Sequence, residues 1–255
     1  MATLRWSFEP SILIGLAAFA GAYGLAVGPL RRRWRLGSTV PLARQLAFTL
    51  GTLCAFIALV SPLDELADHA LFSAHMAQHV LLTFVAPPLW LIGMPAWLAA
   101  RLVPAKARAV LANPLVAFTV FNAVMWLWHL PAAYDAALGN ETLHIGEHLM
   151  FMGSALIGWW PVLGPDLTGQ MRPAVKLGYL IPSLFSCTAL AALITLSAVP
   201  LYPFYAQTTL AWGLTPLVDQ QVGGLVMWMT GDLIDLILIV WVVKALFDQP
   251  QQVTG

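Results

Sequence analysis

Long apolar stretches separated by short breaks make up most of this chain. Pro, Gly and Asn mark the breaks, as in "VSPL", "GMPAW" and "HLPAAY". Crossing about 30 Å of hydrocarbon takes about 20 helical residues. Lipid offers no hydrogen bonds to an open backbone, so each stretch is expected to be a helix. The stretches long enough to span lie at residues 10–30, 42–61, 70–93, 113–130, 143–163, 174–199 and 219–246.

The composition supports a membrane protein. The chain of 255 residues is 60% hydrophobic and 9% charged, whereas soluble domains carry about 25% charged residues. The sequence contains no internal repeat and no linker-like tract. We therefore predict an all-α polytopic membrane protein, a seven-transmembrane helix bundle that forms one domain over residues 1–255. We expect the lipid bilayer, and no nucleic acid, among its partners.

The basic residues predict how the bundle is oriented. Along an alternating seven-span path, eleven of the twelve Lys and Arg residues fall on one side, and Arg5 alone falls on the other. Four of the eleven lie in the "RRRWR" segment at 31–35. Cytoplasmic loops of membrane proteins are enriched in Lys and Arg. The N-terminus is therefore predicted to lie outside and the C-terminus in the cytoplasm.

Two histidine pairs stand out against this apolar background. His75 and His79 lie in "FSAHMAQHVLL", and His144 and His148 lie in "HIGEH". Residues four apart share one helix face. On the predicted path, both pairs lie in the outer turns of their spans, and His129 ends another span on the same side. Ionisable residues inside a span normally face the bundle interior and mark function.

Clustered imidazoles indicate metal binding, because neutral imidazole suits copper, zinc, iron and nickel. We therefore predict a metal site formed by His75, His79, His129, His144 and His148. Thioethers favour Cu(I), and carboxylates often orient ligand imidazoles. The possible additional ligands or supporting partners are Met76, Met152, Met227, Glu147 and Asp68.

Two further acids, Asp232 and Asp235, lie deep in the last predicted span. Carboxylates at that depth are costly and are usually paired or functional. Pairing with Lys176 or Arg172 is one expectation, and proton or ion movement is the other. Their role stays open at this stage.

Three segments resemble a known family. "SPLDELADHALFSAHMAQHVLLTFVAPPLWLIGMP", "WHLPAAYDAAL…HIGEHLMFMGSALIGWWPVLG" and "DQQVGGLVMWM" are similar to the seven-span caa(3)-type cytochrome c oxidase assembly factors, the multi-span kind of CtaG protein. The similarity covers residues 61–246. It implies a multi-pass protein of the bacterial cytoplasmic (inner) membrane that helps to make active oxidase.

The resemblance also implies a role with copper and a set of positions. It suggests that the protein binds copper and aids its insertion into the CuA centre of oxidase subunit II, the expected partner, without being an enzyme. His144 matches less closely than the other positions. The residues at family-motif positions are His75, His79, His129, Glu147, His148, Asp219 and Met227.

Three alternatives are compatible with the same residues. Three histidines with an open position could hold zinc and activate water in an intramembrane metallohydrolase, with Glu147 or Asp68 as the base. A pair of histidines from two helices could instead hold a haem. A scaffold would use its histidines only for hydrogen bonds, and would dock oxidase subunits through the aromatic segment 200–218.

Overall fold

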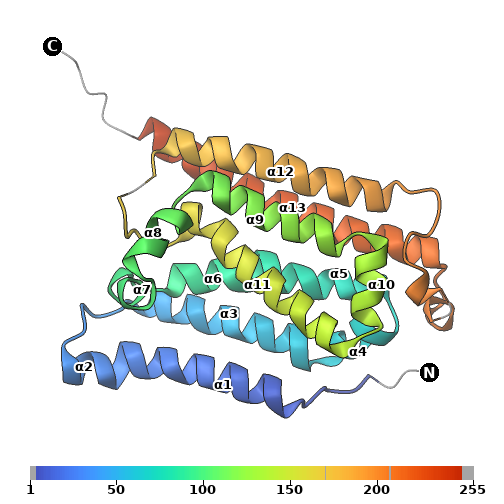
Figure 1. Ribbon diagram of the computed structural model, residues 1–255, viewed down its shortest axis with the longest axis horizontal. Coiled ribbons are helices and arrows are strands. Elements are labelled where there is room, and N and C mark those ends of the chain that lie inside the picture. The colour runs from blue at the N-terminus through green and yellow to red at the C-terminus, as the bar shows by residue number, and fades with distance from the viewer. Residues whose placement is uncertain (1–3, 170, 207, 249–255) are drawn as a thin grey trace.

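The protein is a bundle of roughly antiparallel helices in the computed structural model, which describes residues 4–169, 171–206 and 208–248 (Figure 1). No strand occurs within these residues, which confirms the predicted all-α class. Each predicted span coincides with helical structure. The long elements are α1 (Pro10–Leu25), α3 (Leu42–Val60), α5 (Phe72–Val80) with α6 (Ala86–Gly93), α9 (Pro114–Trp128), α11 (Glu141–Leu163), α12 (Pro173–Thr195) and α13 (Pro216–Phe247).

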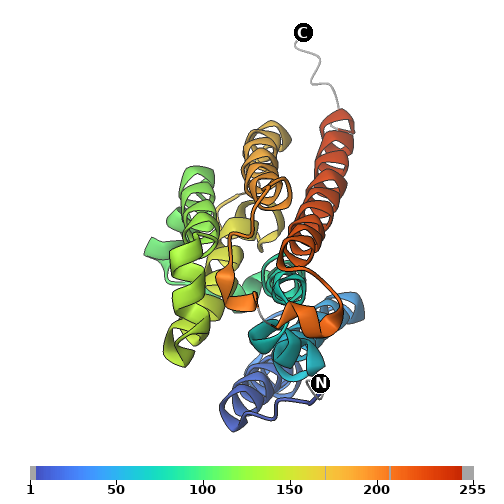
Figure 2. The same ribbon diagram turned by 90° about the vertical axis from the view of Figure 1, so that its right-hand side faces the viewer.

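Short helices that the hydrophobic pattern did not predict occupy the connections. They lie where the chain turns back at the two ends of the bundle (Figures 1 and 2). The α4 helix matters most for the site, because Ser61 caps its first turn and it leads directly into α5. The connecting elements are α2 (Arg31–Trp34), α4 (Pro62–His69), α7 (Ala96–Leu102), α8 (Ala105–Leu111), α10 (Pro131–Leu138), and the 3-10 turns Pro203–Tyr205 and Thr209–Trp212.

Five helical segments among the described residues are long and apolar enough to cross a membrane, and a sixth counts if the bent pair α8–α9 is one span. The α11 helix is not among them, although its 23 residues are sufficient in length. Its composition is less apolar because it carries Glu141, His144, Glu147 and His148. The predicted count of seven therefore stays a prediction, and α11 and the bent pair α8–α9 are the segments in question.

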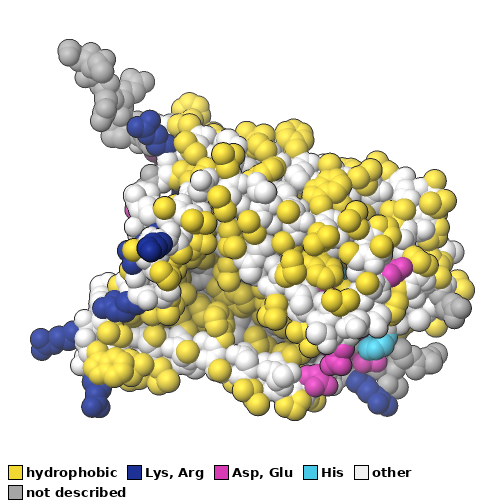
Figure 3. All heavy atoms as spheres, in the orientation of Figure 1, with side chains coloured by type: hydrophobic (Ala, Val, Ile, Leu, Met, Phe, Trp, Pro, Cys, Tyr) yellow, Lys and Arg dark blue, Asp and Glu magenta, His cyan; other side chains and the backbone are white. Residues whose placement is uncertain are grey.

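Charged side chains gather at opposite ends of the bundle. On the face that Figure 3 shows, most Lys and Arg side chains lie at the end of the bundle formed by α2 and α7, and most Asp and Glu side chains lie at the other end. The surface between the two ends is largely hydrophobic. Exposed apolar side chains such as Leu42, Phe185 and Val240 would be unfavourable in water over so large an area. This surface is suited to lipid.

A wide turn separates α5 from α6. Residues Leu81–Val85 form a π-helical turn, and the next segment begins "APP". Pro87 has no N–H to donate to the carbonyl of Thr83 four residues earlier. That carbonyl instead accepts a hydrogen bond of 2.9 Å from Nε1 of Trp159 in α11. The two prolines thus leave a carbonyl free to join α5 to α11, and these are the helices that carry the histidine pairs.

Two adjacent glycines let α13 approach its neighbours closely. A Cβ atom at Gly223 would lie 2.4 Å from the Phe72 ring of α5. A Cβ atom at Gly224 would lie 2.3 Å from Oγ1 of Thr195, the last residue of α12. Helix interiors normally disfavour glycine. The small residues here allow α13 to contact α5 and α12 at once.

We expect Gly223→Ala to destabilise the protein, because the new methyl group meets the rigid Phe72 ring. Overpacking of this kind costs about 1–3 kcal/mol. Gly178→Ala is the matched control, since its Cβ atom meets nothing within 4 Å and alanine favours the helix by about 1 kcal/mol. Thermal unfolding in detergent should give a lower midpoint for Gly223→Ala alone. Equal midpoints for the two variants would contradict the close packing.

Candidate metal centre

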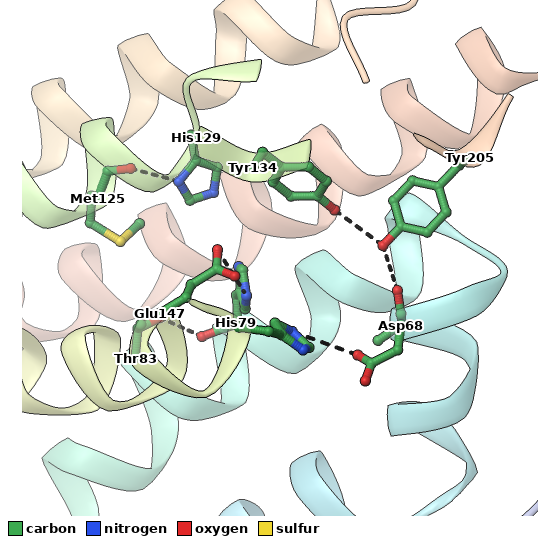
Figure 4. A network of polar contacts seen from close by, with 10 residues as sticks. Asp68, His79, Thr83, Met125, His129, Tyr134, Glu147 and Tyr205 are labelled. Atoms are coloured by element: carbon green, nitrogen blue, oxygen red, sulfur yellow. Dashed lines mark hydrogen bonds and ion pairs between the residues drawn. The ribbon is translucent and has the colours of Figure 1, made fainter. Parts of the chain in front are cut away.

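Four helical segments direct polar side chains into one buried cluster (Figure 4). The α5 helix supplies His75 and His79, and α11 supplies His144, Glu147 and His148. His129 ends α9. Asp68 comes from α4. We call these seven residues the histidine cluster. All five histidines predicted as ligands are brought together with Glu147 and Asp68, whereas the third predicted acid, Asp219, lies outside the cluster.

The imidazole rings lie in contact distance of one another. Ring centres are 4.0 Å apart for His75 and His79, and 4.3 Å apart for His144 and His148. Between the helices, His75 lies 5.5 Å from His144, and His79 lies 5.6 Å from His148. His129 lies 6.1 Å from His79. The spacing of four thus places each pair on one face, and α5 and α11 turn those faces toward each other.

The polar atoms of the cluster are buried without hydrogen-bond partners. Both ring nitrogens of His75 and of His79, both carboxylate oxygens of Glu147, and Nε2 of His129, His144 and His148 are in this state. Each such atom ordinarily costs about 1–3 kcal/mol. Native interiors leave few polar groups unpaired, and each one calls for an explanation such as an ion. So many in one place make this cluster a candidate site for a cation.

Two overlapping sets of donors have the spacing of a metal site. In the shallow triad, His75, His144 and His148 each offer a ligand atom, all within 4.8 Å of one another. In the deep triad, His75, His79 and Glu147 do the same. The Nε2 atom of His79 lies 3.8 Å from Oε1 of Glu147. The residues fit a metal in donor type and spacing, and His75 belongs to both triads.

Asp68 forms the side of the cluster nearest to the surface. Its Oδ1 atom lies 3.7 Å from Nε2 of His144, and the Asp68 side chain is 25% exposed. Burial, with the nearby carboxylates of Asp64 and Glu65, raises the pKa of Asp68 to about 8. A bound cation would favour the ionised form of this group. Asp68 therefore links the shallow triad to the acidic end of the bundle.

Asp219 supports the cluster without belonging to it. Its carboxylate accepts hydrogen bonds from the backbone N–H groups of Phe72 and Ser73, at 2.7 and 3.2 Å, and from Oγ of Ser73. These are unpaired groups of the first turn of α5, whose own N-cap residue, Leu71, supplies no side-chain bond. Asp219 thus caps the helix that carries His75 and His79 from a distant part of the sequence.

The three predicted methionines lie in packed surroundings. Met76 is fully buried, and its Cγ atom lies 3.1 Å from the position of a Cβ atom on Gly223, so it packs against α13. Met152 packs against the core that contains Leu82. Met227 belongs to the larger core cluster. Packing accounts for all three positions.

The two deep acids lie elsewhere in the bundle. Asp232 accepts hydrogen bonds from Thr188 at 2.7 Å and from Trp228 at 2.9 Å. Asp235 is 2% exposed and lines a cavity of about 10 Å³. Lys176 donates to the carbonyl of Val162. No ion pair between these acids and a basic residue occurs among the described residues, so the expected pairing with Lys176 or Arg172 is not found.

Three residues that sequence reasoning did not select complete the surroundings of the cluster. Gln78 joins α5 to its neighbours by donating to the carbonyl of Ala58 and to Asp64. Tyr205 donates to the carbonyl of Ala67, beside Asp68, and Tyr134 donates to Tyr205 (Figure 4). The glutamine lies between the paired histidines, which was a usable signal. The tyrosines come from separate connecting segments, where no spacing rule places them together.

The helical fold and its apolar surface define a membrane protein, and the cluster gives it a buried candidate metal centre. The chain belongs to the cytochrome c oxidase caa3 assembly factor family (Caa3_CtaG), whose profile matches residues 21–249. The family resemblance predicted from the sequence is confirmed.

The curated relatives are longer than this chain, and their names state no function. Uncharacterized proteins of Mycobacterium bovis and Mycobacterium tuberculosis are each 28% identical to this chain over 274 residues, and one of Mycobacterium leprae is 26% identical over 259 residues. These alignments cover 98%, 98% and 92% of this chain, and 40%, 40% and 38% of the relatives. The chain thus spans about two fifths of the length of the relatives. No solved structure matches it.

We expect Asp219→Ala to lower the free energy of unfolding, because it removes the cap of α5. Losing such a cap costs about 0.5–2 kcal/mol. Asp166→Ala is the control, since that carboxylate accepts a hydrogen bond from Gly169 in an exposed turn. Thermal unfolding in detergent and tryptic digestion should both detect the difference. If both variants unfold like the parent protein, Asp219 does not support α5 in this way.

Proposed function

We propose that this protein binds a copper ion as cargo in the histidine cluster and supplies it during oxidase assembly, with the CuA centre of subunit II as the recipient. The unpartnered, buried ring nitrogens of the cluster are the observation that carries the proposal. Membership of an oxidase assembly family supports copper as the metal. Imidazole is a suitable copper ligand, and the cluster supplies five of them.

The membrane arrangement follows from the same features. We propose seven spans in the bacterial inner membrane, with α11 crossing, the N-terminus outside and the C-terminus in the cytoplasm. The gathering of basic side chains at one end supports this orientation. The histidine cluster and the acidic end then face outward. Acidic groups around an entrance raise the local cation concentration.

A second candidate, an intramembrane zinc hydrolase, is favoured by one observation. The deep triad combines two imidazoles with a carboxylate, and zinc hydrolases use such a donor set with water at an open position. Zinc at one per chain, together with cleavage of a lipid amide or ester that stops on zinc removal, would support it. Haem is a poorer fit, because Phe151 and Tyr134 already pack against His79 and His75, at 4.5 and 5.1 Å between ring centres.

Copper retention tests the proposed function. Purified protein is loaded with copper, desalted and analysed for metal. We expect the parent protein to retain copper and the double variant His75→Ala/His79→Ala to lose it, since the shallow triad loses His75 and the deep triad loses both histidines. His69→Ala is the matched control, because His69 is exposed and outside the cluster. Equal retention by the double variant and the parent protein would refute the copper site.

Cells carrying the double variant provide a second readout of the same prediction. We expect assembled oxidase with a reduced copper content and a weaker CuA absorbance. If the cells instead contain less assembled oxidase, and the oxidase that is still assembled has a normal copper content, the protein acts as a scaffold. That outcome would count against copper delivery.

Cysteine labelling tests the membrane arrangement. Glu141, the first residue of α11, and Thr168, beyond its C-terminal end, are both exposed. After Cys54 and Cys187 are replaced by alanine, Glu141→Cys should react with an impermeant maleimide in intact spheroplasts, and Thr168→Cys only after lysis. Reaction of both from the outside would show that α11 does not cross. The reversed pattern would invert the orientation.

A further inference from the structure

The two triads share one residue, and this restricts how they can be used. His75 is fully buried, and neither of its ring nitrogens has a hydrogen-bond partner. A neutral imidazole has only one nitrogen free to accept, because the other carries a proton. Binding two cations at once would require removal of that second proton. Neutral His75 can therefore serve only one triad at a time.

The triads differ in their access to the surface. In the shallow triad, the His144 side chain is 13% exposed and lies next to Asp68, which is 25% exposed. In the deep triad, the side chains of His79 and Glu147 are only 4% and 1% exposed. An ion that arrives from the acidic end of the bundle would meet the shallow triad first.

The triads also differ in charge. The shallow triad consists of three neutral imidazoles, whereas the deep triad contains the carboxyl group of Glu147. Attraction between a cation and a carboxylate is much stronger in a buried site than in water. An ion therefore gains a carboxylate ligand by moving from the shallow triad to the deep one, and the carboxyl proton of Glu147 is released as the ion binds. His75 offers a ligand atom in both triads, so the two positions share one donor residue.

We infer that the histidine cluster is a two-position relay for a single copper ion, in which His144 and His148 receive the ion and His79 and Glu147 hold it, with His75 common to both. This inference rests on the proposed function. It adds an order of events and a stoichiometry of one ion per chain. It also assigns Glu147 a role in slow release and His144 a role in fast uptake.

The experiment compares uptake and release in single variants. Full-length protein in detergent is mixed with Cu(I), and loading is followed by competition with a coloured chelator. Release from loaded protein into excess chelator is then measured. His144→Gln and Glu147→Gln alter one triad each, His75→Ala alters both, and His69→Ala is the control. His79→Asn is a second deep-triad variant, and size-exclusion elution verifies that every variant is folded.

The expected result separates the two steps. His144→Gln should load about 10- to 100-fold more slowly yet release at the parent rate, and Glu147→Gln should load normally yet release faster by a similar factor. His79→Asn should behave like Glu147→Gln. Parent protein should hold one copper per chain, and His75→Ala none.

Three outcomes would overturn the relay. Equal changes in uptake and release for His144→Gln and Glu147→Gln would indicate one undivided site, with copper binding itself intact. Two copper ions per parent chain would show that the triads are filled together. Absence of copper from the parent protein would refute the proposed function as well as the relay. Failure of the relay alone is therefore distinguishable from failure of copper binding.

Discussion

The contact between α5 and α13 is the constraint on which the site depends. One carboxylate, Asp219, binds the first turn of α5, and one turn later Gly223 lets the Phe72 ring lie against α13. Gln220 lies beside Asp219, where it accepts from the backbone of Leu201 and donates to the carbonyl of Ile194. The Asp219 bonds fix the start of α5, and the Gln220 bonds hold this part of α13 against the end of α12 and the connection that follows it. The directions of His75 and His79 follow from that start.

This constraint also explains the "DQQVGG" segment, whose first residue, Asp219, is one of the positions that the family resemblance implied for the site. The segment carries out structural tasks: Asp219 caps a helix, Gln220 joins a connection to the bundle, and the two glycines permit close approach. A burial and capping role cannot be distinguished from a ligand role by residue type alone. Both roles require a polar side chain at a defined position inside an apolar protein.

Physical constraints explain why some parts of this fold could be predicted from the sequence and others could not. Lipid requires long helices, so the predicted span at 42–61 and the observed α3 (Leu42–Val60) agree closely. Helical spacing of four also predicted that each histidine pair shares a face. The short helix α4 was not predicted, because its eight residues carry no hydrophobic run of useful length. The meeting of Asp68, Tyr134 and Tyr205 depends on how three connections fold, and local pattern does not encode that.

The π-helical turn at Leu81–Val85 has one more consequence. Such a turn contains an extra residue, so the helix beyond it is rotated relative to the part before it. A helical wheel drawn continuously through residues 72–93 would therefore misplace every side chain after the turn. Residues on the two sides of the turn face their surroundings independently. Sequence changes in α6 can therefore alter how α6 packs against its neighbours without changing the directions in which the His75 and His79 side chains of α5 point.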